Sequence, residues 1–251
     1  NGLNKKFTFN TLGGAIESYQ LYYFSPNLLL QSYPFYIDVH KTSRSSVENT
    51  YLLNQYNLST SLFTIKINNI NNCAFNLVLF NYKLFYNSNN SIESFKGFIP
   101  SISLNRKSDN SKFDFIMQYY VFKNSTNQNY LNLNIYNFNK LYFSTNKNIY
   151  LTFKNNFNLN FATNIPEYNK IYVGGEDGVR AYEENPLLNS EEIQKNLKTQ
   201  NLIFSSIELA IPFWKHHLFQ THLLVFFDYA IHANEYDNFN LNNNIYGYGF
   251  G

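Results

Sequence analysis

The chain has 251 residues and a formal charge of +2, from 19 Lys and Arg against 17 Asp and Glu, which excludes the polyelectrolyte signature of a nucleic-acid-binding protein. Its single cysteine, Cys73, excludes an internal disulfide and a cysteine-based metal cluster. No run approaches the roughly 18 consecutive apolar residues that a transmembrane helix needs, so the sequence also excludes that element.

Alternation of apolar and polar residues with a period of two dominates from Phe7 onward and predicts β-strands. It is clearest in residues 113–121 and 151–161, where Phe, Met, Tyr, Val and Leu share one side of each strand. We expect roughly a dozen strands of about 9 to 12 residues, close to what a tilted strand needs to cross a bilayer. Segments rich in Asn, Ser and Asp favour turns between them, at residues 42–46, 68–72, 87–90, 107–112, 124–128, 144–148 and 164–169.

The side of these strands opposite the apolar one is rich in amides. A soluble sandwich would expose Lys, Glu and Thr there, whereas a membrane barrel turns its polar side to a wet lumen and its apolar side to lipid. The sequence therefore predicts an all-β protein with the fold of an antiparallel transmembrane β-barrel. No internal repeat and no break in composition marks a second domain, so we interpret residues 1–251 as one barrel domain.

Residues 174–200 interrupt this rhythm of strands and short turns. The stretch begins with Gly174 and Gly175, continues through Val179 and Arg180 to Tyr182, and stays polar as far as Gln200. A connection this long in a compact all-β pattern is usually functional or disordered. We predict a loop that folds inward and is gripped by the barrel wall, with one short helical turn over 189–196.

The two strands after this loop place carboxylates on their polar side. Parity puts Glu208 on the first strand and Asp228 on the second in the lumen, together with Phe226. An enclosed carboxylate is costly unless it is paired, and a guanidinium such as that of Arg180 can bind one in a bidentate, charge-assisted way. The residues alone leave open the alternative that Arg180 is solvated and Asp228 has no partner.

Three motifs, in this order, resemble those of an outer-membrane β-barrel superfamily that inserts or translocates proteins. A Gly-Gly pair and a short spacer precede Val-Arg-Ala-Tyr at 179–182, where the family has Val-Arg-Gly-Phe or Val-Arg-Gly-Tyr. Phe-Phe-Asp-Tyr-Ala at 226–230 is similar to the family's Phe-x-Asp-x-Gly. Residues 246–251 look like the Gly-aromatic start of the following strand. The superfamily includes BamA-type assembly factors, their mitochondrial and plastid counterparts, and two-partner secretion transporters.

The resemblance implies specific roles for these residues. It implies that Arg180 locks the loop to the barrel wall through Asp228, with Glu208 as a second partner and Phe226 and Tyr182 packed around the pair. Ala181 and Ala230 replace family glycines. If Ala181 needs a positive φ, or if a ring must stack on bare backbone at Ala230, the extra methyl costs about 1 kcal/mol or more and loosens the lock.

The resemblance also implies that the chain is an excerpt of a longer protein, in keeping with its start at Asn1. It holds about 12 of the 16 strands of the family's barrel. We expect the other strands mainly after Gly251, with one or two before Asn1, and the POTRA modules that precede the barrel in this family also lie outside the chain.

The function expected from the resemblance is insertion or translocation of proteins at an outer membrane, bacterial or organellar, with a plastid-type or bacterial assembly barrel favoured. Its partners would be unfolded client polypeptides, membrane lipid and accessory assembly or translocation subunits. We expect no enzyme, cofactor or metal site, because Gly-x-Ser-x-Gly, phosphate-binding and zinc-spacing motifs are absent and His222 has no recognisable ligand set.

Three alternatives differ in what they predict. A two-partner secretion transporter would share the motifs. A diffusion porin or structural barrel would carry a constricting loop with no inward salt bridge. A soluble β-sandwich binding module would bury its apolar faces against each other in a dry core.

Overall fold

The structure is a computed structural model that describes residues 6–13, 16–25, 35–45, 51–66, 71–86, 91–123, 128–143, 149–174, 178–180, 198–215, 220–235 and 243–251. Every regular element in these ranges is a β-strand except η1 (Glu167–Asn169), a single 3-10 turn. Within the same ranges no helix is both long and apolar enough to cross a membrane.

Twelve strands of the described ranges form one sheet in which their order follows the chain. All strand pairs with an assigned register are antiparallel. The prediction of an all-β, antiparallel fold is therefore confirmed. The strands of this sheet are β1 (Lys6–Leu12), β2 (Ile16–Ser25), β3 (Phe35–Ser45), β4 (Tyr51–Lys66), β5 (Asn71–Tyr86), β6 (Ile92–Lys107), β7 (Ser111–Lys123), β8 (Tyr130–Tyr142), β9 (Tyr150–Phe161), β12 (Asn201–Lys215), β13 (Gln220–Ala233) and β14 (Asn244–Phe250).

Several strands are longer than the sequence predicts. β4, β5 and β6 have 16 residues each, so the expected length of about 9 to 12 residues is wrong for them. The predicted turn at 42–46 is also wrong, because β3 continues to Ser45, which pairs with Leu52. The reason is that backbone pairing in an antiparallel ladder continues beyond the point where apolar side chains end. The predicted turn between β6 and β7 is confirmed, and Ser108 N–H donates there to the carbonyl of Ser111 at 2.8 Å.

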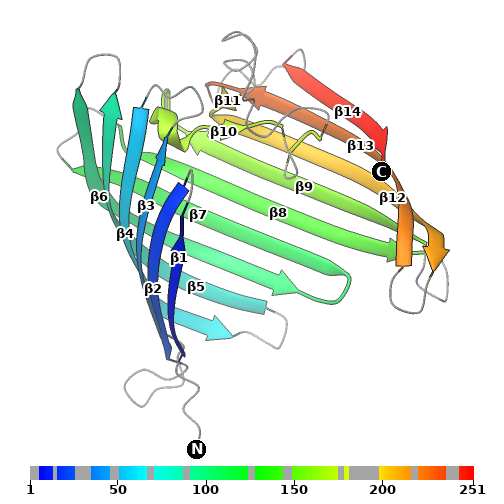
Figure 1. Ribbon diagram of the computed structural model, residues 1–251, viewed down its shortest axis with the longest axis horizontal. Coiled ribbons are helices and arrows are strands. Elements are labelled where there is room, and N and C mark those ends of the chain that lie inside the picture. The colour runs from blue at the N-terminus through cyan, green and yellow to red at the C-terminus, as the bar shows by residue number, and fades with distance from the viewer. Residues whose placement is uncertain are drawn as a thin grey trace, which may run out of the picture. The chain divides into compact units, whose positions relative to one another are not determined.

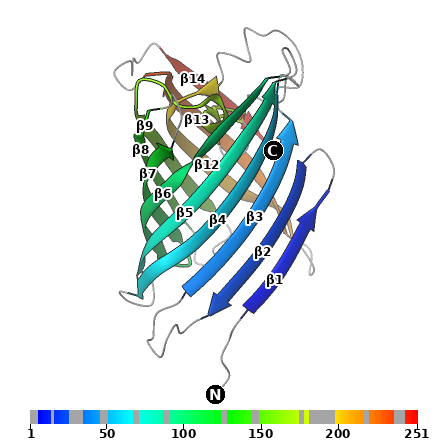
Figure 2. The same ribbon diagram turned by 90° about the vertical axis from the view of Figure 1, so that its left-hand side faces the viewer.

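The backbone clusters into two compact units. The first holds residues 1–104 and 116–132, and the second holds 105–115 and 133–251. Figure 2 shows β1 to β5 of the first unit side by side. Figure 1 shows β9, β12, β13 and β14 of the second, also side by side. The candidate functional residues all belong to the second unit.

In the first unit many apolar side chains of β1 to β5 are exposed on one face, and the opposite face carries polar pairs together with the buried side chains of Leu53, Phe80 and Leu84. Phe9 is 62% exposed and Val39 45% exposed. On the other face Gln20 donates to Asp38 at 2.7 Å, and Ser18 and His40 form a hydrogen bond of 2.8 Å. A soluble sandwich would bury the apolar face in a dry core, so this distribution contradicts that alternative.

The second unit contains a small apolar cluster where the interrupting segment meets the sheet. It consists of Val173 before the interrupting segment, Val179 within it, Leu202 and Phe204 on β12, and Ala230 on β13, all at most 3% exposed. Two short strands, β10 (Ile171–Tyr172) and β11 (Lys198–Thr199), pair with each other at the two ends of this segment. The predicted helical turn at 189–196 lies outside the described residues.

Buried amides fix the far end of the segment to the sheet. The Gln200 side chain donates to the Ala162 carbonyl at 2.7 Å and accepts from the N–H of Ile165 at 3.2 Å. Asn160 donates to the carbonyl of Gln200 at 2.6 Å, and its own N–H donates to the Asn201 side chain at 2.6 Å. Because unpaired buried polar groups are costly, this arrangement defines where β12 begins.

Candidate functional site

The backbone just before Arg180 folds tightly against itself. The N–H of Val179 donates to the carbonyl of Val173 at 2.9 Å, and Gly174 and Val179 form an isolated parallel bridge. A side chain at Gly178 would overlap the carbonyl group of Val173, so only glycine permits this approach. Val173 and Val179 are both 0% exposed, which anchors the turn in the apolar cluster. Arg180 therefore leaves this turn from a fixed point.

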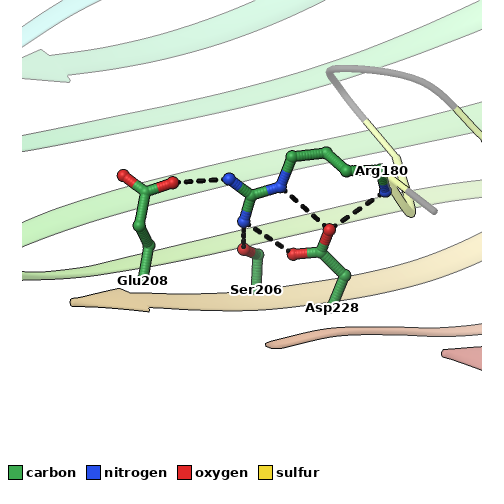
Figure 3. A network of polar contacts seen from close by, with 4 residues as sticks. All are labelled: Arg180, Ser206, Glu208 and Asp228. Carbon is green, nitrogen blue, oxygen red and sulfur yellow. Dashed lines mark hydrogen bonds and ion pairs between the residues drawn. The ribbon is translucent and has the colours of Figure 1, made fainter. Parts of the chain in front are cut away.

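The Arg180 side chain lies along the wall formed by β12 and β13 and donates hydrogen bonds to three side chains (Figure 3). Its Nε and Nη2 donate to the two carboxylate oxygens of Asp228 at 3.0 and 2.9 Å. Its Nη1 donates to Glu208 at 2.5 Å. Nη2 also donates to the Ser206 hydroxyl at 3.2 Å. The guanidinium thus binds Asp228 in the bidentate manner that gives such pairs their geometric specificity.

The backbone of Arg180 takes part as well. Its N–H donates to Asp228 Oδ2 at 3.0 Å, the same oxygen that accepts from Nε. Strand register explains why the acceptors converge, since Ser206 lies directly opposite Asp228 and Glu208 is two residues further along β12. Residues two apart on a strand share a face, so three acceptors meet one guanidinium.

An aromatic ring and a glycine complete the site. The Phe226 ring lies under the guanidinium, with Arg180 Cζ 3.7 Å from the ring centroid, which is cation–π geometry. Phe226 pairs with Gly249 on β14. A Cβ on Gly249 would lie only 2.8 Å from Cζ of that ring. The bare backbone of β14 therefore leaves the space in which Phe226 lies beneath Arg180.

Burial makes these contacts energetically consequential. The Asp228 side chain is 0% exposed, and those of Glu208 and Arg180 are 16% and 23% exposed. Burial lowers the pKa of the Arg180 guanidinium, but its hydrogen bonds to Asp228 and Glu208 outweigh this and raise the pKa above its ordinary value. The cation is thus retained, and removal of either charge would leave the other without compensation in an enclosed place.

The structure places the sequence-predicted residues as follows. Arg180, Glu208, Phe226 and Asp228 come together, and Gly174 lies in the bridge that precedes them. Gly175, Ala181 and Tyr182 lie outside the described residues.

The concern about Ala230 is wrong. Its methyl group is buried in the apolar cluster, and the ring that stacks on bare backbone lies instead at Gly249. Ala230 pairs with Phe204 and Ile245, at a different level of the sheet from Phe226.

Sequence reasoning missed the roles of Ser206, Gly178 and Gly249. Ser206 has the parity of Glu208, so its side of the sheet was available from the pattern. Its place opposite Asp228 required the register between β12 and β13. In the described ranges no group of three or more His, Cys, Asp and Glu could hold a metal ion.

Comparison with known proteins decides the family. The whole chain, residues 1–251, matches the model of the Omp85 superfamily domain. This chain belongs to the Omp85 superfamily. The resemblance drawn from the three motifs is thereby confirmed, and the Omp85 domain is an outer-membrane β-barrel domain.

Solved structures share the fold of this Omp85 domain at low identity. BamA from Haemophilus ducreyi lacking POTRA domains 1–3 aligns with a TM-score of 0.82 and 14% identity, over 99% of this chain and 58% of that chain. CdiB from Acinetobacter baumannii aligns with a TM-score of 0.60 and 15% identity, over 94% of this chain and 43% of that one. CdiB from Escherichia coli aligns with a TM-score of 0.59 and 8% identity, over 94% of this chain and 45% of that chain. A search of curated proteins found no significant match.

The Omp85 domain described here thus spans less than two thirds of the BamA chain with which it aligns. Its outer-membrane location explains why the apolar side chains on one face are exposed, because that face meets lipid.

Proposed function

We propose that this Omp85 domain is the barrel part of a protein that inserts or translocates other polypeptides at an outer membrane. The observation that carries the proposal is the binding of Arg180, by its guanidinium and its backbone N–H, to Asp228 on the sheet wall. We call the contacts of Arg180 with Asp228, Glu208 and Ser206 the lock. An ion pair with a fully buried carboxylate has a positional purpose in this proposal, since burial of such a pair contributes little net stability.

In this proposal the lock holds the start of the long segment against β12 and β13 while a client polypeptide passes through the lumen or a lateral seam. The mechanism needs no covalent chemistry and no cofactor, and the protein is not an enzyme. The partners are unfolded client polypeptides, membrane lipid, and accessory subunits that deliver the clients.

Within the superfamily we favour an insertase of the bacterial or plastid assembly type over a two-partner secretion transporter. The sequence motifs support this preference, because Phe-Phe-Asp-Tyr followed by a turn and Gly-Tyr-Gly-Phe-Gly looks most like those barrels. A plain diffusion porin is disfavoured, since its loop would constrict the lumen without the inward salt bridge that Arg180 makes.

A charge-swap cycle on the full-length protein tests the proposal. The protein and its variants Arg180→Asp, Asp228→Arg and the double variant are reconstituted in liposomes. An unfolded outer-membrane β-barrel protein is then added, and the rate at which it becomes folded and protease-resistant is measured. Each single variant is expected to slow client folding at least tenfold, and the double variant is expected to recover part of that loss by restoring the pair in reverse.

Arg106→Asp and Asp109→Arg serve as matched controls, because both side chains are exposed, Arg106 near the end of β6 and Asp109 in the turn that follows. They should leave client folding unchanged. If the Arg180→Asp variant folds the client at the wild-type rate, the lock has no role in client folding and the proposal is contradicted. If wild-type protein conducts ions but never accelerates client folding, the porin alternative replaces the insertase.

A further inference from the structure

Lys41 on β3 lies on the lipid-facing side of the first unit, between two tyrosines. Its Nζ is 5.7 Å from the ring centroid of Tyr19 on β2 and 5.8 Å from that of Tyr56 on β4. The register puts Lys41 directly opposite both tyrosines. Tyr19 and Tyr56 are 46% and 41% exposed, so both residues can be reached by a partner from outside the chain.

The rows of side chains on either side of Lys41 differ sharply in polarity. On one side of the row that contains Lys41, two residues away along each strand, five side chains from β1 to β5 lie next to one another in register. Each of the five residues is at least 40% exposed. This apolar row consists of Phe9, Leu21, Val39, Leu58 and Leu79. Two residues in the other direction, the corresponding row consists of Glu17, Ser43, Asn54 and Lys83.

The polarity changes from hydrocarbon-like to water-like across the row of Lys41. Successive rows on one face are about 7 Å apart, from a rise of roughly 3.4 Å per residue. Exposed apolar side chains face the acyl chains, and Lys and Tyr concentrate where the hydrocarbon ends. Tyr19, Lys41 and Tyr56 therefore lie at the level of the lipid headgroups.

The amine of Lys41 lacks a protein counter-charge in the described part of the chain, where no carboxylate comes within salt-bridge distance of it. Glu17, exposed on β2, is the acidic group in the adjacent polar row. Cation–π contacts at nearly 6 Å are at the long end of their range, so the rings orient the ammonium group without neutralising it.

We propose that Lys41, Tyr19 and Tyr56 form a binding site for the phosphate of an anionic phospholipid headgroup. The ammonium group of Lys41 supplies the charge, and the two phenol hydroxyls can donate hydrogen bonds to phosphate oxygens. The acyl chains of the same lipid lie over the adjacent apolar row, at Leu21, Val39 and Leu58. The site thus recognises a charged headgroup and a hydrocarbon chain together, which a free phosphate ion does not offer.

Native mass spectrometry of the full-length protein tests this site. Detergent-solubilised protein is titrated with phosphatidylglycerol, and the fraction carrying bound lipid is measured for wild type, Lys41→Gln and Lys83→Gln. One lysine near a lipid surface contributes about a fivefold change in binding, so Lys41→Gln should weaken the tightest lipid site about fivefold. Lys83→Gln is the matched control, because Lys83 is an exposed lysine in the outer polar row.

Equal losses for the two lysine variants would show non-specific attraction of anionic lipid and overturn the proposal, as would unchanged binding by Lys41→Gln. The double variant Tyr19→Phe/Tyr56→Phe should bind phosphatidylglycerol more weakly than wild type. The same two substitutions added to Lys41→Gln should not change lipid binding any more than Lys41→Gln does alone. Titration with glycerol 1-phosphate separates the two sources of phosphate. If glycerol 1-phosphate binds as tightly as phosphatidylglycerol, the site binds phosphate alone and the proposal of a lipid site is contradicted. Heat-modifiable migration on gels verifies that each variant is folded.

Discussion

Asp228 and Glu208 are unequal partners of Arg180. Asp228 accepts three of the hydrogen bonds and is fully buried, whereas Glu208 accepts one and keeps 16% of its side chain exposed. Water can solvate a partly exposed carboxylate when its partner is lost, but it cannot reach a buried one. The two acids should therefore respond very differently to neutralisation.

We expect Asp228→Asn to lower the free energy of unfolding by about 3–5 kcal/mol, because it leaves the Arg180 charge beside a neutral group in an enclosed site. Glu208→Gln should cost only about 1–2 kcal/mol, since one charge-assisted hydrogen bond is weakened and Asp228 still compensates the guanidinium. Urea unfolding in detergent micelles, followed by tryptophan fluorescence and gel migration, measures both. A larger loss for Glu208→Gln would contradict this division of roles.

The absence of a side chain at Gly249 leaves room for the Phe226 ring. A methyl group there would come within 3.0 Å of two atoms of the Phe226 ring and push the ring away from Arg180. We expect Gly249→Ala to destabilise the protein by about 1–3 kcal/mol, as overpacking does. The loss should shrink when Phe226→Leu is introduced as well, because the two residues are in contact and their effects are coupled.

Gly13→Ala is the control for this measurement, because nothing lies within 4 Å of the position that its Cβ would take. Additive effects of Gly249→Ala and Phe226→Leu would show that the ring does not depend on the bare backbone of β14.

The turn that delivers Arg180 depends on a single close approach of backbone to backbone. We expect Gly178→Ala to open this turn, since its methyl group would overlap Val173 and the backbone cannot yield as a flexible side chain would. The segment after Arg180 should then be cleaved by added protease much faster than in wild type, while the strands stay protected. Limited proteolysis with mass spectrometry locates the cuts. Wild-type cleavage would show that the turn tolerates a side chain.

Much of the arrangement of β12 and β13 around Arg180 could be predicted from the sequence, and the part that could not has a physical cause. Parity places Glu208 and Asp228 on one side because strand side chains alternate strictly. It cannot tell which residue of β12 faces which residue of β13, so Ser206 was missed although it lies opposite Asp228. The contact of Phe226 with Gly249 depends likewise on register between β13 and β14, which is set by contacts across strands.

Ala230 illustrates the same limit from another side. It departs from the family motif, and the motif implies a cost at this position if a ring must stack on bare backbone there. The structure places its methyl group among Val173, Val179 and Phe204, where a methyl group fills space. Substitution of a motif residue is thus judged by its neighbours in three dimensions. Strand ends were misjudged for a related reason, since composition records where side chains change and not where backbone pairing stops.

Along the strands of the first unit, the polarity of the lipid-facing side chains changes with depth in the membrane. Arginine substitutions along β3 should therefore cost stability in proportion to depth, because a charge on the lipid face is most unfavourable far from the headgroups. Ile37→Arg should cost most, at about 2–4 kcal/mol, Val39→Arg less, and Ser43→Arg about 0–1 kcal/mol. Equilibrium unfolding from phospholipid vesicles measures the series. Equal losses at the three positions would contradict the membrane boundary drawn through Lys41.

The doubled contact of Arg180 with Asp228 bears on how the loop is released. The side chain and the backbone N–H of Arg180 together make five hydrogen bonds to the wall, and three of them end on one carboxylate. Their geometries depend on one another, so a small displacement of the turn weakens all of them at once. Loss of the Asp228 carboxylate would therefore remove three of the five hydrogen bonds at the same time, so the turn at Arg180 is held by coupled contacts and not by a series of independent ones.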